Sequence, residues 1–240
     1  MLAFDPPLVR GRLVRRYKRF LADVVLETGE EVKAACPNTG SMLGLAEPGT
    51  VVWLSISDSP LRKLRHTWEL LELENRGTRA LVGINTGRPN RIVEAAIGSG
   101  RVPELAGYDR IRREVRYGKR SRVDLLLEAA GRPPCYVEIK NVHLSRRTGL
   151  AEFPDSVTAR GTRHLVELSA MAAGGARAVM FYLVQRDDAQ NFALAHDIDP
   201  SYAAAHVAAR AQGVEAIAYC CRLSPETISV DCQLPIIDPE

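Results

Sequence analysis

The first third of the chain gathers apolar residues into short segments, as β-strands do. Residues 9–14 alternate apolar with basic side chains, and residues 20–26 have the sequence FLADVVL before the turn-like pair Thr28 and Gly29. Three further segments follow at residues 31–35, 51–56 and 67–74. Five short strands this closely spaced predict a small β-barrel, for which an OB-like barrel is the natural candidate.

The rest of the chain mixes helical and strand patterns. Residues 85–90 (NTGRPN) are rich in turn formers, and Pro89 can occupy the first turn of a helix that ends near Ile97. Further helices are predicted at residues 156–173 and 201–212, and strands at 178–184, 214–220 and 228–230. The apolar run AVMFYLV at 178–184 is typical of a strand buried on both faces. We therefore predict a barrel domain at residues 1–80 and an α/β domain at 81–240, with a mixed sheet flanked by helices.

Residues 112–140 predict three strands joined by two tight turns, and these turns gather acidic residues. The first turn centres on Gly118-Lys119-Arg120 and the second on Gly131. Symmetric reversal at each turn places Glu114 opposite Asp124, and Asp124 opposite Glu138, with Cβ atoms of opposed residues about 5 Å apart. Lys140 lies two residues beyond Glu138 and so projects from the same face.

Three carboxylates and one ammonium group in a single patch predict a metal site. Carboxylates this close repel, so one would keep its proton or a cation would join them. Oxygen ligands suit Mg²⁺, Mn²⁺ or Ca²⁺ rather than zinc. A cation held by Asp124 and Glu138 could bind a phosphate oxygen and activate water, while Lys140 offset the developing charge. This is the chemistry of metal-dependent phosphodiester hydrolysis.

A polar strand face is the alternative, because Glu-x-Lys is a weak motif by itself. The chain contains a second copy, Glu31-Val32-Lys33, which has the same spacing but no acidic residue on a well-formed upstream strand. A slip of one residue in either predicted hairpin would also turn a carboxylate to the opposite face. The metal site therefore depends on the register of the two hairpins.

Length and composition favour an ordinary globular protein. The chain has 240 residues, no apolar run long enough to span a membrane, and no N-terminal pattern typical of a signal peptide, so we expect a cytoplasmic protein without a membrane partner. Of its five cysteines only Cys220 and Cys221 are close in sequence, and no Cys-x-x-Cys pair occurs. Zinc and redox sites are therefore not predicted, and buried thiols are the better expectation.

Basic residues cluster beside the predicted chemistry, although the net charge is only +3. One cluster lies at residues 10–19, a second at 110–122, next to the carboxylates, and a third, Arg146 and Arg147, follows the Glu-x-Lys strand. Most charge runs are solvated surfaces, but two clusters beside a hydrolytic site suit a polyanion backbone, so we expect a nucleic-acid partner. The candidate contacts are Arg15, Arg16, Lys18, Arg120, Arg122, Arg160, Arg163 and His164.

Several motifs together resemble the sugar fermentation stimulation protein (SfsA) family along nearly the whole chain. They are CPNTGSM at residues 36–42, NTGRPN at 85–90, RREVRYGKRSRVDLLL at 112–127, YVEIKNV at 136–142 and FPDSVTARGTRHLVEL at 153–168. The resemblance implies an OB-type N-terminal domain followed by a PD-(D/E)xK nuclease-like domain, whose signature falls on Asp124, Glu138 and Lys140, with Glu114 as an added acid. It also implies DNA binding and regulation of sugar, notably maltose, metabolism. His143 stands where the family usually has a hydroxyl residue, and could add a metal ligand.

Three functional hypotheses follow. The first is a nuclease that depends on Mg²⁺ or Mn²⁺, with Asp124, Glu138, Lys140 and Glu114 as its catalytic set. The second is a DNA-binding regulator that keeps the nuclease fold without cutting, since a fold does not fix a function. The third is an enzyme acting on a phosphorylated sugar, which ranks last because the sequence has no glycine-rich phosphate loop.

Overall fold

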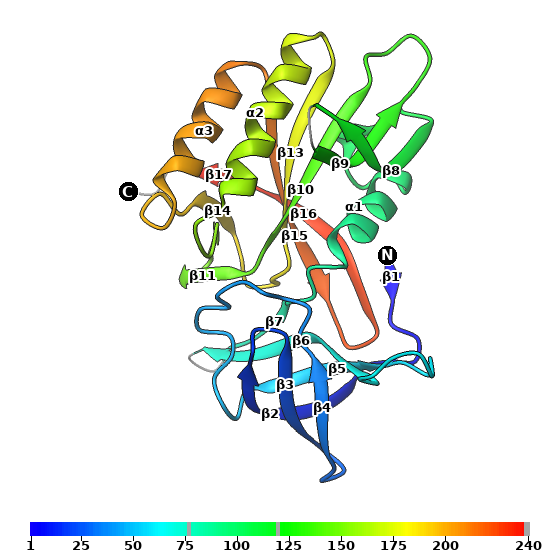
Figure 1. Cartoon of the computed structure of the whole chain (residues 1–240), viewed down its shortest axis with the longest axis vertical. Helices are drawn as coiled ribbons and strands as arrows, with labels where there is room; N and C mark the ends of the chain where they lie inside the picture. Colours follow the sequence, from blue (N-terminus) through cyan, green and yellow to red (C-terminus); the bar gives the residue numbers. More distant parts are fainter. Residues whose placement is uncertain (76–77, 119–120, 238–240) are drawn as a thin grey trace.

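The structure is a computed structural model, and it describes residues 1–75, 78–118 and 121–237. A β-barrel made by the first part of the chain lies at one end, and a larger sheet with helices on both faces makes up the remainder (Figure 1). Within the described residues, no helix has both the length and the apolar character needed to cross a membrane.

The barrel has the predicted strands. They are β2 (Val9–Tyr17), β3 (Leu21–Leu26), β4 (Glu31–Ala35), β5 (Val51–Ile56) and β6 (His66–Asn75). A sixth strand, β7 (Thr78–Gly83), was not predicted and extends the sheet beyond β6. The strand order is β4-β3-β2-β5-β6-β7, and a parallel pairing of β4 with β6 closes β2 to β6 into a barrel of five strands. Trp68, Leu71 and Val82 are buried in its core. The OB-like barrel is therefore confirmed.

The larger sheet contains seven strands in the order β1-β16-β15-β13-β10-β9-β8. They are β1 (Leu2–Ala3), β8 (Arg110–Tyr117), β9 (Ser121–Glu128), β10 (Cys135–Val142), β13 (Arg177–Val184), β15 (Glu215–Leu223) and β16 (Thr227–Leu234). β13 pairs in parallel with β10 and β15, whereas the other neighbours are antiparallel. The sheet is mixed, as predicted.

Helices cover both faces of this sheet and explain the apolar run in β13. The helices are α1 (Pro89–Gly98), the short 3-10 helix η1 (Pro103–Leu105), α2 (Ala159–Ala173) and α3 (Pro200–Ala211). Val179 and Phe181 pack on the α1 side, whereas Met180 and Tyr182 pack on the side of α2 and α3. Because both faces are covered, each side chain of the run is buried.

Some elements differ from those predicted. α2 begins at Ala159 rather than at residue 156, because Thr158 is its N-cap and accepts a hydrogen bond from the Gly161 N–H. A small sheet of β11 (Leu144–Arg147), β12 (Leu150–Phe153), β14 (Asn191–Leu194) and β17 (Ile236–Ile237) was not predicted. The tip of the first predicted turn, Lys119 and Arg120, lies outside the described residues.

The predicted division near residue 80 falls within β7, which continues the barrel sheet to Gly83. β1, at the start of the chain, pairs with β16 in the larger sheet instead of joining the barrel. The barrel sheet therefore continues past the predicted division, and the first strand of the chain belongs to the larger sheet. The boundary itself stays a prediction.

Candidate functional site

The register of the two hairpins is as predicted. In β8 and β9, Arg113 faces Leu125 and Val115 faces Val123, which leaves Glu114 level with Asp124. The ladder of β9 and β10 runs from the pair Leu127 and Cys135 to the pair Leu125 and Val137. It stops one pair short of Asp124 and Glu138, where the Asp124 carboxylate replaces a backbone acceptor: Oδ2 accepts the Ile139 N–H at 2.7 Å.

All four predicted catalytic residues line one pocket of about 460 Å³. The walls come from the segment before α1, from α1 itself, from β8 to β10, and from α2. The lining residues are Thr86, Gly87, Pro89, Asn90, Glu114, Asp124, Glu138, Ile139, Lys140, Asn141, Arg160 and His164. Two segments outside the predicted three-strand meander, the start of α1 with the residues before it and the first turns of α2, therefore meet the meander at this point.

Glu138 is the most deeply buried of the acids that line the pocket, with 3 % of its surface exposed. Its Oε1 contacts the Lys140 Nζ at 2.8 Å and the His164 Nδ1. Arg160 Nε donates to His164 Nε2 at 3.3 Å, which assigns the ring proton to Nδ1, so that Nδ1 donates to Glu138. Burial alone would raise the pKa of Glu138, but the His164 hydrogen bond and the Lys140 charge outweigh it and hold the pKa below its ordinary value. Glu138 is therefore the ionised acid of the site.

The other oxygen of Glu138, Oε2, is buried and has no hydrogen-bond partner among the described residues. A buried carboxylate oxygen without a partner is costly, and such atoms in native structures call for an explanation such as an ion. With Oε1 occupied by His164 and Lys140, Oε2 is the atom of Glu138 that is free to bind a ligand.

Asp124 has the opposite electrostatic character. Burial, and next the charge of Glu138, raise its pKa to about 6, against the hydrogen bonds from Ile139 and Asn90. Asn90 Nδ2 donates to Asp124 Oδ1 at 2.9 Å and to Glu114 Oε1 at 3.2 Å. The Asn90 amide thus bridges two carboxylates that would otherwise repel. Two neighbouring acids with pKa values displaced in opposite directions are typical of functional sites.

The donor set fits a hard divalent cation, with Asp124 and Glu138 as the principal ligands. Their oxygens are the type that Mg²⁺, Mn²⁺ and Ca²⁺ prefer. Glu114 is exposed and has a left-handed backbone conformation with φ 51°. Within the described residues, the oxygens of Glu114, Asp124 and Glu138 do not all lie within 4.8 Å of one another. Glu114 would therefore have to reorient, or act through water, to join the other two.

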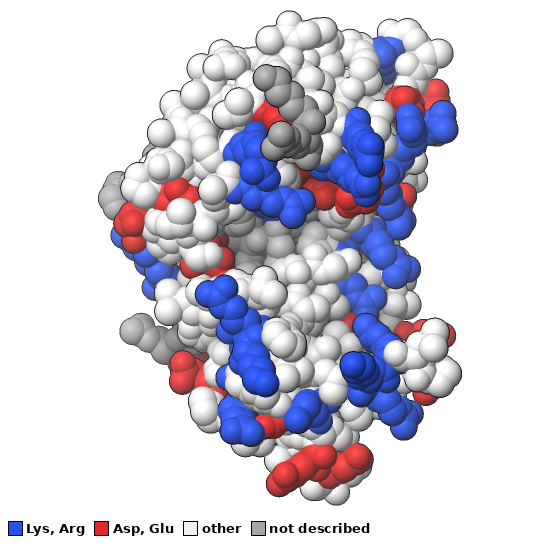
Figure 2. Space-filling view, in the orientation of Figure 1, with Lys and Arg blue, Asp and Glu red and all other residues white. Residues whose placement is uncertain are grey.

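The predicted phosphate contacts fall into three groups. Arg160 and His164 line the pocket, although His164 is buried against Glu138 rather than presented to solvent. Arg122 and Arg163 are exposed, and Figure 2 shows Lys and Arg side chains around a hollow between α2 and the barrel. Arg120 lies outside the described residues.

The barrel contributes the third group. Lys18 is exposed, and Arg15 is paired with Asp23 at 2.8 Å on the surface. Arg16 is half-buried, and its Nη2 donates to the backbone carbonyls of Asn38 and Gly40 at 2.9 Å each. Arg16 therefore stabilises the loop of residues 36–42, whereas Lys18 and Arg15 face solvent.

His143, considered above as an added metal ligand, does not line the pocket. It is buried, and its Nε2 lies 3.4 Å from Asp155 Oδ2. Its carbonyl oxygen accepts a hydrogen bond from Arg186. His143 therefore contacts Asp155 and Arg186 and does not face the pocket.

Neither Asn90 nor Glu69 was identified from the sequence, and Glu69 is the buried acid whose hydrogen bonds hold the start of α1 in place. Glu69, with 2 % exposure, accepts hydrogen bonds from Ser55, from Asn85 and, through two nitrogens, from Arg88. This network anchors the start of α1 to β6 and so fixes Asn90 at the mouth of the pocket. The NTGRPN motif was the available signal, but its turn residues suggested only a loop and a helix start.

Two family models match the chain. The SfsA N-terminal OB domain matches residues 14–84, and the sugar fermentation stimulation protein RE domain matches residues 87–227. The chain belongs to the sugar fermentation stimulation protein family. The pocket described above lies in the part matched by the RE domain, except for Thr86 at its edge.

Curated relatives cover almost the full chain. A sugar fermentation stimulation protein homolog of Agrobacterium fabrum is 56% identical over 229 residues, which is 95% of this chain and 94% of that protein. A homolog of Paramagnetospirillum magneticum is 55% identical and covers 97% of both chains. Among solved structures, SfsA of Pyrococcus furiosus in complex with Ca²⁺ is similar with a TM-score of 0.85, 28% sequence identity and 96% coverage of each chain.

Proposed function

We propose that this protein is a DNA-binding member of its family, with a PD-(D/E)xK nuclease-like site that hydrolyses phosphodiesters with Mg²⁺ or Mn²⁺. Regulation of sugar metabolism, notably of maltose, would be its physiological role, and DNA as partner would place it in the cytoplasm. The observation that carries the proposal is the unpartnered, buried Oε2 of Glu138, in one pocket with Asp124 and Lys140.

The similar protein of Pyrococcus furiosus supports a cation site in the family, since its structure is a complex with Ca²⁺. Ca²⁺, Mg²⁺ and Mn²⁺ share a preference for oxygen ligands. A bound Mg²⁺ or Mn²⁺ would contact a phosphate oxygen and lower the pKa of a coordinated water. In this chain Glu138 would hold it through Oε2, together with the Asp124 carboxylate and with Glu114 as a further acid.

The remaining pocket residues suit the other tasks of hydrolysis. Lys140 Nζ lies 2.8 Å from Glu138 and 3.3 Å from His164 Nδ1, so its ammonium group is fixed at the pocket wall and can offset charge on a phosphate. His164 fixes the orientation of Glu138 through Oε1. Arg160 is exposed beside it and can bind a neighbouring phosphate.

Substitution of the two principal acids tests the proposal. Asp124→Ala and Glu138→Gln should each lower Mn²⁺- or Mg²⁺-dependent cleavage of DNA by ~10²-fold or more, since each removes a ligand, and should leave DNA affinity nearly intact. Glu31→Gln is the matched control, because Glu31 belongs to the other Glu-x-Lys sequence and is exposed on β4. Failure of the wild-type protein to cleave any form of DNA or RNA with either metal would reject the nuclease.

A DNA-binding regulator without catalysis is the second candidate, favoured by the exposed Lys18 and Arg15 on the barrel. Binding to DNA should then weaken steeply with salt, and Lys18→Ala and Arg15→Ala should each reduce the slope of log affinity against log salt by about one. Arg16→Ala added to these should weaken binding further, through the loop that Arg16 holds. The exposed Arg222 on β15, which pairs with Asp231, provides the control in Arg222→Ala. Affinity that does not change with ionic strength would contradict any DNA-binding role.

A further inference from the structure

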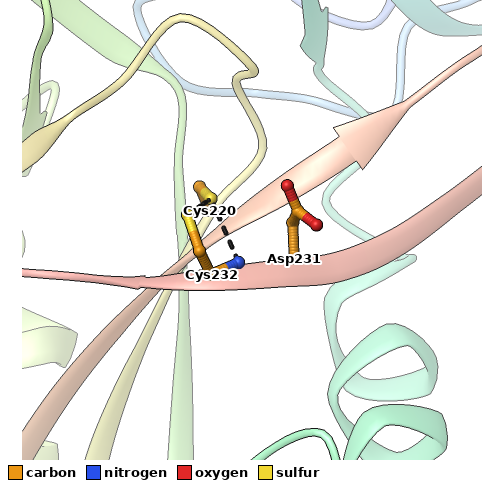
Figure 3. Close-up of side chains that lie close together, drawn as sticks. All are labelled: Cys220, Asp231 and Cys232. Atoms are coloured by element: carbon orange, nitrogen blue, oxygen red, sulfur yellow. Dashed lines mark hydrogen bonds between the residues drawn. The ribbon is translucent and has the colours of Figure 1, made fainter.

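Cys220 and Cys232 face each other across two antiparallel strands. β15 and β16 pair Ala218 with Leu234 and Tyr219 with Gln233, so the next pair in the same register is Cys220 with Cys232. Beyond it the register shifts, and Asp231 is the extra residue of the bulge. The two sulfur atoms lie 2.7 Å apart, and Figure 3 shows both side chains directed toward one another.

The two thiols have complementary environments. Cys220 is buried, and its Sγ accepts the Cys232 N–H at 3.3 Å. Burial, and next the hydrogen bond with Cys232, raise the pKa of Cys220 to about 12, so this thiol keeps its proton. Cys232 is exposed and can meet a solute from the solvent. One accessible thiol in contact with one protected thiol is the arrangement of an attacking and a resolving cysteine.

The other three cysteines have no such partner in the described part of the chain, which includes all five. Cys36 and Cys135 are buried in other parts of the fold. Cys221 follows Cys220 directly but packs on the α1 side of the sheet, whereas Cys220 packs on the side of α2 and α3. Cys220 and Cys221 are adjacent in sequence, but strand geometry directs these two side chains to opposite faces.

We propose that Cys220 and Cys232 form an oxidative modification site, at which hydrogen peroxide closes a reversible disulfide. The Cys232 thiolate attacks one peroxide oxygen, the O–O bond breaks, and the leaving hydroxide takes a proton to become water. Cys220 sulfur then attacks the sulfur of the resulting Cys232 sulfenic acid. The S–S bond forms, the S–O bond breaks, and the second hydroxide leaves with the Cys220 proton as water. Two thiols are oxidised and one peroxide is reduced to two waters.

A metal held by the same residues is less compatible with the geometry. Cys220, Asp231 and Cys232 each have a ligand atom within 4.8 Å of the others. Two thiolates on one tetrahedral zinc would be roughly 3.7 Å apart, given Zn–S bonds of about 2.3 Å, and these sulfurs are closer. Asp231 Oδ1 is also occupied by Arg222 Nη2 at 3.0 Å. The site is independent of the proposed hydrolytic function.

Counting free thiols in the full-length protein tests the proposal without relying on any variant. The reduced protein is treated with equimolar hydrogen peroxide or with buffer, denatured in N-ethylmaleimide, and weighed intact. The buffer sample should take five maleimides, one for each cysteine, and the peroxide sample three, because two cysteines are joined. The unlabelled mass should fall by two hydrogen atoms, and dithiothreitol should restore all five labels.

Variants identify the pair. Cys221→Ser, the matched control, should still lose two labels on oxidation, whereas Cys220→Ser and Cys232→Ser should form no intramolecular disulfide. Equal labelling with and without peroxide would overturn the proposal, as would a disulfide that includes Cys221. Labels that are blocked in the reduced protein and released by a chelator would assign the cluster to a metal instead.

Discussion

Asn90 shows how one neutral side chain tunes an acidic site. Its amide donates to both Asp124 and Glu114, and thereby bridges two carboxylates that would otherwise repel. A donor to a carboxylate favours its charged form, which is why this hydrogen bond opposes the effect of burial on Asp124. Asn90 therefore keeps Asp124 easier to ionise than its buried position alone would allow.

Removal of this amide should make Asp124 a weaker acid. In Asn90→Ala the charged form of Asp124 loses a donor, so its pKa should rise above its present value of about 6, by up to about one pH unit. A ¹³C NMR titration of the Asp124 carboxyl carbon, without added metal, measures this directly. Thr86→Ala is the control, since Thr86 lines the same pocket but donates to the Pro37 carbonyl instead. A pKa that stays constant or falls would show that Asn90 does not stabilise the ionised acid.

At the scale of elements, the meander of β8 to β10 was the most predictable part of the site. Its turns at Gly118 and Gly131 have positive φ values of 56° and 73°, which glycine adopts easily. The first turn fixes the register of Glu114 against Asp124, and the second fixes that of Asp124 against Glu138. The alternation of apolar and polar residues along a strand, and the presence of turn-forming residues, are local properties, so they can be recognised in a single sequence. The same holds for the barrel strands and for α1, which begins at Pro89 as expected.

Elements that depend on distant partners were not predictable in the same way. β14 and β17 have four and two residues, and they are strands only because β12 and β14 offer them an edge. His164 was expected to contact phosphate from its place on α2, but the packing of α2 on the sheet turns it against Glu138. Local pattern predicts that a helix exists, whereas tertiary packing decides what its polar side chains touch.

At the scale of the whole molecule, the loop of residues 36–42 connects the barrel to the segment before α1 and to the segment between β12 and α2. The Pro37 carbonyl accepts hydrogen bonds from the N–H and hydroxyl of Thr86, which lines the pocket. Ser41 Oγ and the Met42 N–H donate to Asp155, at 3.1 and 3.4 Å from its Oδ2. The CPNTGSM segment therefore links the barrel to Thr86 and to Asp155.

Asp155 is the centre of this link, and its charge should contribute to stability in a pH-dependent way. Burial alone would raise the pKa of Asp155, but the close contact with His143, and next the hydrogen bonds from Met42 and Ser41, outweigh it and hold the pKa well below its ordinary value. A carboxyl whose pKa is depressed by folding stabilises the native state above its unfolded pKa of about 3.9, and this contribution is lost as the pH falls further. The contribution of Asp155 should therefore be complete at neutral pH and decline below about pH 4.

Asp155→Asn should accordingly cost about 1–3 kcal/mol of unfolding free energy at pH 7, the typical effect of weakening a buried hydrogen-bonded charge. Urea unfolding of both proteins from pH 7 to pH 3 measures the difference, which should shrink below about pH 4, where the carboxyl of the unfolded wild-type chain begins to protonate while that of the folded chain stays ionised. Asp58→Asn is the control, because Asp58 is exposed and only loosely paired with Arg65 at 3.5 Å, and it should leave stability unchanged. If Asp155→Asn is as stable as the wild type at pH 7, or if the difference persists undiminished at pH 3, the charge of Asp155 does not hold the loop of residues 36–42 against the segment between β12 and α2.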